Sequence, residues 1–363
     1  MESRFIITSK QLIFILIGSQ IATGIFSLPR LVTTEAGTHG WLAVIVGAIP
    51  AYISIWLIVN LGNKFPGQNF VGLSKQLFGK YLGSFLVIAF IIYIVIYQSI
   101  VIRIFVETTS LYMLPSTPIP VILFLVQASV VYIVMQGGKV IGRLNELLFY
   151  ISVAILLLLL CAFSQADCTN ILPLGDIDLG GLWQGALSAS YAYAGTEVLL
   201  VVFFMVNNKD KALKAALTGQ TIVLVIYFIV VVLSILVFGI YAMEEMLRPL
   251  LILLKGVEFP LFDRLELFFL SFWMGLGIRP VINLGLAAAY SSSMLINRNF
   301  NYYKIIVLLT GILMYFIALI PKNVLQAMEW SVYIGYVYLG VALSYPLLYS
   351  LLGFLRRDKK HEF

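Results

Sequence analysis

The sequence predicts an all-α integral membrane protein with ten membrane-spanning helices. Of its 363 residues, 61% are hydrophobic and only 11% are charged, whereas a soluble domain is nearer half apolar and a quarter charged. The mean hydropathy is +1.01. The apolar runs are about 20 residues or longer and lack the alternation of barrel strands, which favours helices.

The ten predicted spans follow directly from the apolar runs. They cover approximately residues 11–31, 41–61, 83–110, 119–136, 144–163, 183–205, 217–240, 266–296, 304–321 and 328–353. Between them, residues 62–83 and 207–219 are expected to form short interfacial helices on the cytoplasmic side. Residues 241–265 mix apolar turns with charges and predict a lid of short helices on the opposite side.

The loop charges predict the orientation. Of the 23 Lys and Arg residues, 16 fall in segments on the N-terminal side of the membrane, five fall on the other side, and two fall within spans. Cytoplasmic loops carry the excess of Lys and Arg, so both termini are expected in the cytoplasm of a multi-pass membrane protein. This distribution is a topology signal and does not form the clustered basic face that nucleic acid requires.

The ten spans divide into two equal halves. Residues 1–163 would form a first five-helix repeat, 164–182 an extracellular connecting loop, and 183–363 a second repeat ending in a cytoplasmic tail. An odd number of spans in each half forces opposite orientations, so repeats of this kind are inverted, as in many transporters.

The first span of each half is weakened in the same way. Span 1 contains "GSQIATGIFSLP" (18–29) and span 6 contains "GALSASYAYAGTE" (185–197). Glycine inside a helix costs about 1 kcal/mol relative to alanine, and Ser and Thr can redirect backbone hydrogen bonds. Such paired interruptions point to a binding site near the membrane midplane. The alternative is that the small residues only let helices pack closely.

The interruptions predict complementary charges. If span 1 unwinds near Ile21–Thr23, a new half-helix begins near Gly24, and the amides of Gly24, Ile25 and Phe26 suit a carboxylate. Span 6 runs the other way, and unpaired carbonyls near Tyr191–Tyr193 would suit an ammonium group. A zwitterionic amino acid offers both charges.

Four charged residues lie well inside the predicted spans, away from their ends. Arg103 and Glu107 are four residues apart on one helix face, Glu197 follows the span 6 interruption, and Arg279 lies in span 8 before Pro280. Intramembrane charges are functional candidates by default. The alternatives are a structural Arg103–Glu107 pair, a role for Glu197 in bonding unwound backbone, and a structural pairing for Arg279.

Other chemistry is not indicated. We find no P-loop, nucleophile elbow or metal-ligand spacing, and the cysteines and histidines are too few and scattered to suggest a disulfide framework or metal site. We therefore expect no enzyme activity, no cofactor, no metal and no nucleic-acid partner.

Several segments together resemble a known family. They are "GIFSLPRLVTTEAGTHGW" (24–41), "LPSTP" (114–118), "GTEVLL" (195–200), "FDRLELFFLSFW" (262–273) and "YIGYVY" (333–338). In order and spacing they resemble the spore germination permease family, the B subunits of nutrient germinant receptors of spore-forming bacteria. The resemblance covers essentially the whole chain.

The resemblance implies a fold and a ligand site. The family is related to the amino acid–polyamine–organocation transporters, which implies the inverted-repeat fold of the bacterial leucine transporter and a site between spans 1, 3, 6 and 8. Carried over by position, the site residues are Ser19, Gln20, Ala22, Thr23, Gly24 and Ile25; Tyr97, Gln98 and Val101; Tyr191, Tyr193, Gly195 and Thr196; and Asn283.

The resemblance also implies a function and partners. It implies a subunit that senses a small nutrient, an amino acid in the first instance, in the spore inner membrane, with an A subunit and a C-subunit lipoprotein as partners. The alternative is a secondary amino acid transporter of the same fold. Sodium-coupled relatives place hydroxyls at mid-depth in span 8, whereas Ser291–Ser293 lie near its cytoplasmic end. Some proton-coupled relatives use a lysine in span 5, and 151–163 has none. Both departures favour sensing or uncoupled permeation.

Overall fold

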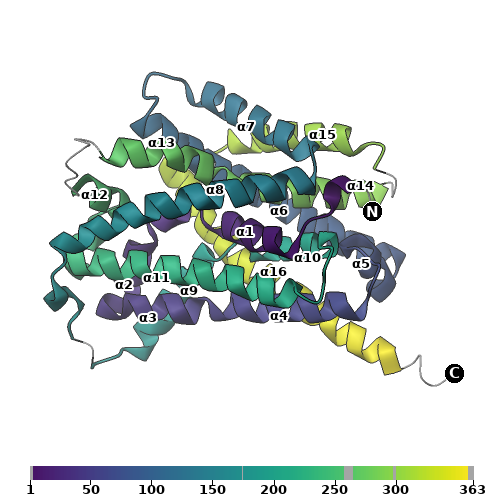
Figure 1. The fold of residues 1–363 in the computed structure, drawn as a ribbon, viewed down its shortest axis with the longest axis horizontal. Helices are drawn as coiled ribbons and strands as arrows, with labels where there is room; N and C mark the ends of the chain where they lie inside the picture. Colours follow the sequence, from purple (N-terminus) through teal and green to yellow (C-terminus); the bar gives the residue numbers. More distant parts are fainter. Residues whose placement is uncertain (1–2, 174, 257–264, 297–299, 359–363) are drawn as a thin grey trace.

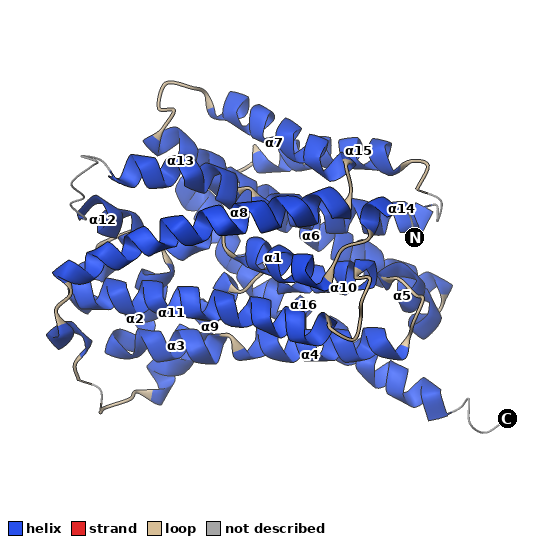
Figure 2. Ribbon diagram, in the orientation of Figure 1, coloured by secondary structure: helices blue, strands red, loops and turns tan. Residues whose placement is uncertain are grey.

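A computed structural model describes residues 3–173, 175–256, 265–296 and 300–358. This part of the chain is built of helices joined by loops (Figure 2). The α-helices are α1 Ser9–Gln20, α2 Leu28–Ala36, α3 Gly40–Gly47, α4 Ile49–Lys64, α5 Phe70–Phe78, α6 Lys80–Tyr112, α7 Ile119–Met135, α8 Gly138–Leu159, α9 Leu179–Ala192, α10 Leu199–Val202, α11 Ala212–Glu244, α12 Pro249–Gly256, α13 Leu265–Gly277, α14 Arg279–Ile296, α15 Tyr303–Ala318 and α16 Val324–Asp358. Short 3₁₀ helices include η2 (Thr23–Phe26), η6 (Thr196–Val198) and η7 (Phe203–Met205).

The helices reproduce the predicted spans. In chain order the spans are α1–α2, α3–α4, α6, α7, α8, α9–η7, α11, α13–α14, α15 and α16. By length and hydropathy, five stretches of the described chain can cross a membrane, and the pair α9 and η6–η7, bent by 49°, is a sixth candidate. α7 and α15 are apolar but shorter. The all-helical, polytopic prediction is therefore confirmed.

Both expected helix breaks are present. α1 ends at Gln20, Ile21 and Ala22 have extended backbone, and the chain resumes as η2 and then α2. Pro29 lies in the first turn of α2, where its missing amide hydrogen has no cost. In the second half, α9 ends at Ala192, and Gly195 has a φ of +114°, a left-handed conformation that favours glycine.

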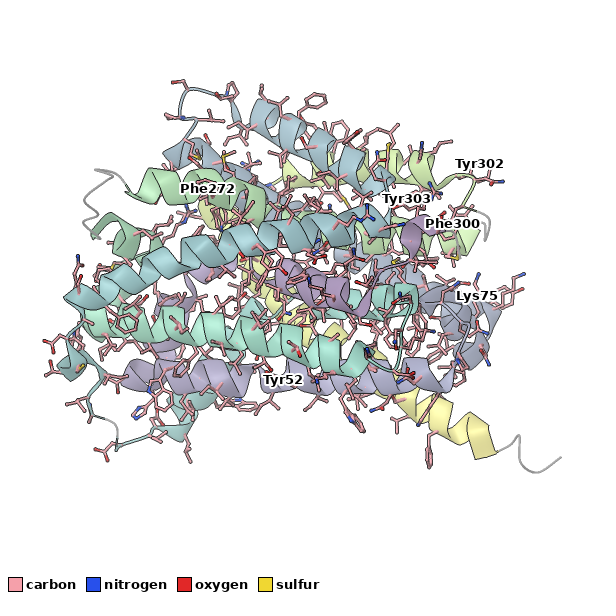
Figure 3. All side chains as sticks on the ribbon, in the orientation of Figure 1. Tyr52, Lys75, Phe272, Phe300, Tyr302 and Tyr303 are labelled. Atoms are coloured by element: carbon pink, nitrogen blue, oxygen red, sulfur yellow. The ribbon has the colours of Figure 1, made fainter. Side chains whose placement is uncertain are left out.

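The two broken spans are joined at the end near the N-terminus. Ile7 donates to the carbonyl of Met205 and accepts from Asn207, each at 3.0 Å, and the Ser9 hydroxyl donates to Asn208. Phe5 packs on Phe300 and Tyr303, which Figure 3 labels near this end. Both chain termini and α5 lie at the same end of the molecule (Figure 1).

The connecting segments agree only partly with expectation. α5 is the short helix predicted within 62–83. The separate helix predicted within 207–219 is wrong, because α11 begins at Ala212 and continues without interruption into the seventh span. α12 is one helix of the expected lid, and residues 257–264 lie outside the described part of the chain.

Candidate functional site

A cavity of about 260 Å³ lies between α2, α9 and α16, beside the first helix break. Thr23 and Gly24 border it from η2, and Tyr191 borders it from the end of α9. α6 contributes Ile104, and Leu247 comes from the segment before α12. The cavity therefore adjoins one half-helix of each broken span, α2 and α9.

The ring of Tyr191 forms the wall of the cavity nearest the breaks. A β-carbon built on Gly24 would lie 4.0 Å from the Tyr191 Cε1 atom, an ordinary contact distance. A β-carbon built on Gly335 of α16 would lie only 2.7 Å from Tyr191 Cδ2. Gly335 thus leaves room for the ring against α16, and Gly24 has open space beside it.

Polar and charged side chains border the same cavity. Gln184 and Ser188 are four residues apart on α9 and so share one helix face. Arg30 and Glu35 of α2 add one positive and one negative charge. The remaining lining is largely apolar, including Leu31, Leu187, Met328, Val332 and Leu339. The arrangement suits a small molecule that carries both charges and an apolar part.

Three of the predicted ligand residues, Thr23, Gly24 and Tyr191, line this cavity. The structure places the other predicted residues elsewhere in the packed interior. Those are Ser19, Gln20, Ala22, Ile25, Tyr97, Gln98, Val101, Tyr193, Gly195, Thr196 and Asn283. Their role in ligand binding remains a prediction.

A buried amide network holds α1 against α8 and α14. Asn283 donates to the Ser19 hydroxyl at 3.0 Å and to the carbonyl of Ile15 at 3.2 Å. The amide of Asn145, on α8, donates to Asn283 at 2.8 Å. Sequence reasoning missed Asn145, although an amide within the predicted apolar span 144–163 is a recognisable signal, and the structure shows it fully buried.

The carbonyls at the breaks are bonded within the chain. The Tyr227 hydroxyl, on α11, lies 2.9 Å from the carbonyls of both Gln20 and Ala192 and shares its proton between them. The Thr196 hydroxyl donates to Tyr193, and the Ala194 amide donates to Tyr191. The expectation of unpaired carbonyls at Tyr191–Tyr193 is therefore wrong, because backbone inside a membrane must be satisfied locally.

Glu197 bonds the unwound backbone of the second break. Its carboxylate accepts a 2.8 Å hydrogen bond from the Tyr93 hydroxyl and another of 2.8 Å from the Gly195 amide, and the side chain is fully buried. The Tyr93 ring stacks on Tyr97, which is also buried. Tyr193 is held by its own hydrogen bond to the carbonyl of Val44 at 3.0 Å.

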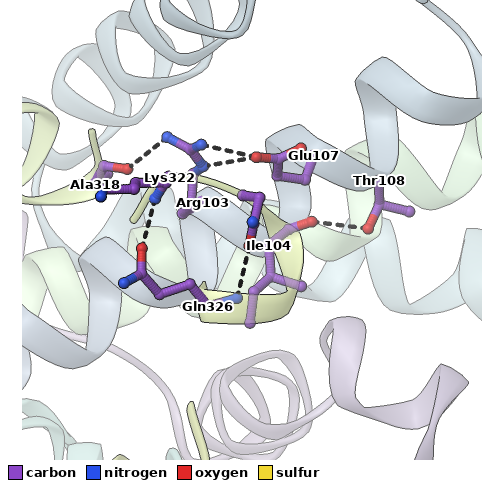
Figure 4. A network of polar contacts seen from close by, with 8 residues as sticks. Arg103, Ile104, Glu107, Thr108, Ala318, Lys322 and Gln326 are labelled. Carbon is purple, nitrogen blue, oxygen red and sulfur yellow. Dashed lines mark hydrogen bonds and ion pairs between the residues drawn. The ribbon is translucent and has the colours of Figure 1, made fainter. Parts of the chain in front are cut away.

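The other intramembrane charges have different environments. Arg103 pairs with Glu107 at 2.8 Å and donates to the carbonyl of Ala318 at 3.1 Å, which links α6 to the end of α15 (Figure 4). Arg279 donates through Nε to Leu276 at 3.0 Å, and its two terminal nitrogens have no hydrogen-bond partner within the described chain. The structural pairing considered for Arg103 is present.

Comparison with known proteins identifies the family. The sequence profile described as "Spore germination protein" matches residues 6–327. The chain belongs to the spore germination protein family. This spore germination protein is 27% identical to Spore germination protein YndE of Bacillus subtilis (strain 168), over 94% of its own length and 92% of that protein. It is 22% identical to Spore germination protein GerQB of Bacillus cereus, over 93% of each chain.

Solved structures show what fold this spore germination protein has. A sodium-coupled sialic acid symporter in a substrate-bound, outward-open state has a TM-score of 0.68 at 10% identity, covering 92% of this chain and 78% of its own. MhsT in complex with L-phenylalanine has a TM-score of 0.64 at 13% identity, covering 95% and 97%. The predicted leucine-transporter-like fold with broken helices 1 and 6 is confirmed.

Proposed function

We propose that this spore germination protein is a nutrient-sensing membrane subunit of a germinant receptor, and that it binds an amino acid in the cavity between α2, α9 and α16. The observation that carries the proposal is that this cavity adjoins the helix breaks while Arg30 and Glu35 border it with opposite charges. An amino acid could place its carboxylate near Arg30 and its ammonium group near Glu35.

The position of the cavity suggests how binding is sensed. α2 and α9 form its walls, and each is separated from the rest of its span by non-helical backbone. Backbone breaks of this kind are where half-helices can rotate as units. A ligand shifts such an equilibrium only by its difference in affinity for the two states. α16 forms the opposing wall, so the contacts between the ligand and α16 would have to differ between the two states to give this difference in affinity.

The assembly and location form part of the same proposal. We expect an A subunit and a C-subunit lipoprotein as partners, in the spore inner membrane, with residues 1–163 and 183–363 as the inverted repeats and 164–182 as the connecting loop. The two termini lie at one end of the molecule (Figure 1), which supports their being on one side. The excess of basic residues there supports the cytoplasmic side.

The fold also supports a second candidate, a secondary amino acid transporter. The solved structures with this fold include a sodium-coupled symporter. Purified protein in proteoliposomes separates the two functions. A sensor is expected to bind a labelled amino acid without accumulating it under a sodium or proton gradient, and gradient-driven accumulation would support the transporter.

Binding itself is tested on the purified protein in detergent. Thermal unfolding is measured with each of the common L-amino acids in turn. A ligand that binds only the folded state at about 100 times its Kd stabilises by about 2.7 kcal/mol, enough to raise the Tm clearly. No shift with any amino acid, in a protein shown to be folded, would contradict the proposal.

A further inference from the structure

The side chain of Gln98 lies outside the nutrient cavity. It is fully buried on α6 and faces α14, where a β-carbon built on Gly285 would lie 3.2 Å from its Nε2 atom. Neither Nε2 nor Oε1 of Gln98 has a hydrogen-bond partner within the described chain. A buried amide without hydrogen bonds lowers the free energy of unfolding, so we expect Gln98 to have a hydrogen-bond partner.

A second glutamine borders the same space. Gln127 of α7 is 4% exposed, and its Nε2 atom donates to the carbonyl of Gly311 on α15 at 3.1 Å. Its Oε1 atom has no partner in the described part of the chain. Together the two side chains present one unpaired donor nitrogen and two unpaired acceptor oxygens.

A cavity of about 10 Å³ lies between these side chains. Gln98 and Gln127 both line it, together with Gly285, Gly311 and Val134. A cavity needs roughly 10–15 Å³ of volume, about that of one water-sized sphere, to hold one water molecule. The volume is therefore sufficient for a single water molecule.

We infer that this cavity binds one structural water, which bridges Gln98 and Gln127. One water molecule can donate its two hydrogen bonds to the two acceptor oxygens and accept a hydrogen bond from the Gln98 nitrogen. If the Gln98 amide is rotated by about 180°, its nitrogen and oxygen exchange places, but the numbers of donor and acceptor atoms stay the same. Buried waters typically make about three such bonds. A bare metal cation fits less well, because it would meet the Gln98 NH₂ group.

The water would connect the core of the bundle to its periphery. Gln98 belongs to α6, and Gln127 joins α7 to α15 through Gly311. The water site is independent of the nutrient proposal, because neither glutamine borders the nutrient cavity.

A density map of the full-length protein that resolves ordered waters tests the site directly. We expect one isolated peak at about 2.7–3.2 Å from the side-chain amides of Gln98 and Gln127. A map in which the cavity is empty, or in which the two amides bond each other directly, overturns the inference.

A double-mutant cycle tests the bridge in solution. Gln98→Met and Gln127→Met each remove polar atoms from the water site at similar side-chain length, and we expect each to lower the Tm. Each single variant leaves the other glutamine without its bridging water. The double variant should therefore lower the Tm by less than the sum of the two single shifts. Additive shifts would contradict a shared water.

A glycine pair gives a test that leaves both glutamines in place. A methyl group at Gly285 would approach the Gln98 amide, whereas one at Gly275 in the same span meets only Leu148 Cδ2 at an ordinary 3.7 Å. We expect Gly285→Ala to lower the Tm and remove the density peak, and Gly275→Ala to do neither. A persistent peak in Gly285→Ala would overturn the placement of the water.

Discussion

Gly195 packs directly against the backbone carbonyl of Ser19, so that a β-carbon at Gly195 would overlap the Ser19 oxygen. The two broken helices therefore touch backbone to backbone at their breaks. Gly195 also has a φ of +114°, which L-residues rarely adopt. Two independent constraints thus require glycine at this position.

Gly195→Ala is expected to destabilise the protein severely. A non-glycine residue at such a φ alone costs about 1–3 kcal/mol, and the clash with Ser19 backbone adds to it, because backbone cannot rotate away as a side chain can. The measurement is folded yield and Tm in detergent. Gly340→Ala is the control, because Gly340 lies within α16 with open space around it; equal behaviour of the two variants would contradict the proposed contact.

Tyr227→Phe is expected to lower the Tm although it removes a single oxygen atom. The change leaves the carbonyls of Gln20 and Ala192 without their hydroxyl donor. Buried acceptors without a donor lower the free energy of unfolding by about 1–3 kcal/mol. Tyr52→Phe is the matched control, since the Tyr52 hydroxyl bonds the Thr221 hydroxyl, which can donate to its own helix backbone instead. Similar Tm losses in both variants would argue against a specific role at the breaks.

Arg103 and Glu107 are expected to be energetically coupled. Glu107→Gln leaves the largely buried guanidinium of Arg103 without its counter-charge, and Arg103→Met strands the carboxylate. The double variant should therefore lower the free energy of unfolding by less than the sum of the two single variants, with a coupling energy of about 1–3 kcal/mol. Denaturation of the four proteins of this cycle measures it, and strict additivity would show that the pair contributes nothing.

The sequence was sufficient to predict the spans and the breaks. Apolar runs determine where the helices lie in the membrane, and the glycines near Gly24 and Gly195 mark where helical bonding fails. It was not sufficient to predict what bonds the broken backbone, because Tyr227 comes from another span of ordinary composition. Partners of this kind depend on how distant helices pack, which one sequence does not reveal.

The candidate site was predicted only in part for the same reason. Thr23, Gly24 and Tyr191 border the cavity, but α6 contributes Ile104 to it, two turns beyond the predicted Tyr97. The cavity reaches the breaks at Gly24 and Tyr191 but extends away from them along α2 and α9, whereas the resemblance implied a site level with the breaks. Arg30 lies at the end of the predicted first span, 11–31, and Glu35 lies beyond it, so the span boundaries alone do not place these two charges at the site.

Gly24 allows the central claim to be tested by filling the cavity. A side chain at this position would enter open space, with Tyr191 Cε1 at 4.0 Å as its nearest neighbour. Gly24→Val is therefore expected to fold while occupying ligand volume. Gly340→Val adds the same group away from the cavity and serves as the control.

The most direct measurement is the amino-acid-induced rise in Tm of wild type, Gly24→Val and Gly340→Val. We predict that the amino acid that stabilises the wild type also stabilises Gly340→Val and has no effect on Gly24→Val. An undiminished rise in a folded Gly24→Val protein would contradict binding in the cavity between α2, α9 and α16.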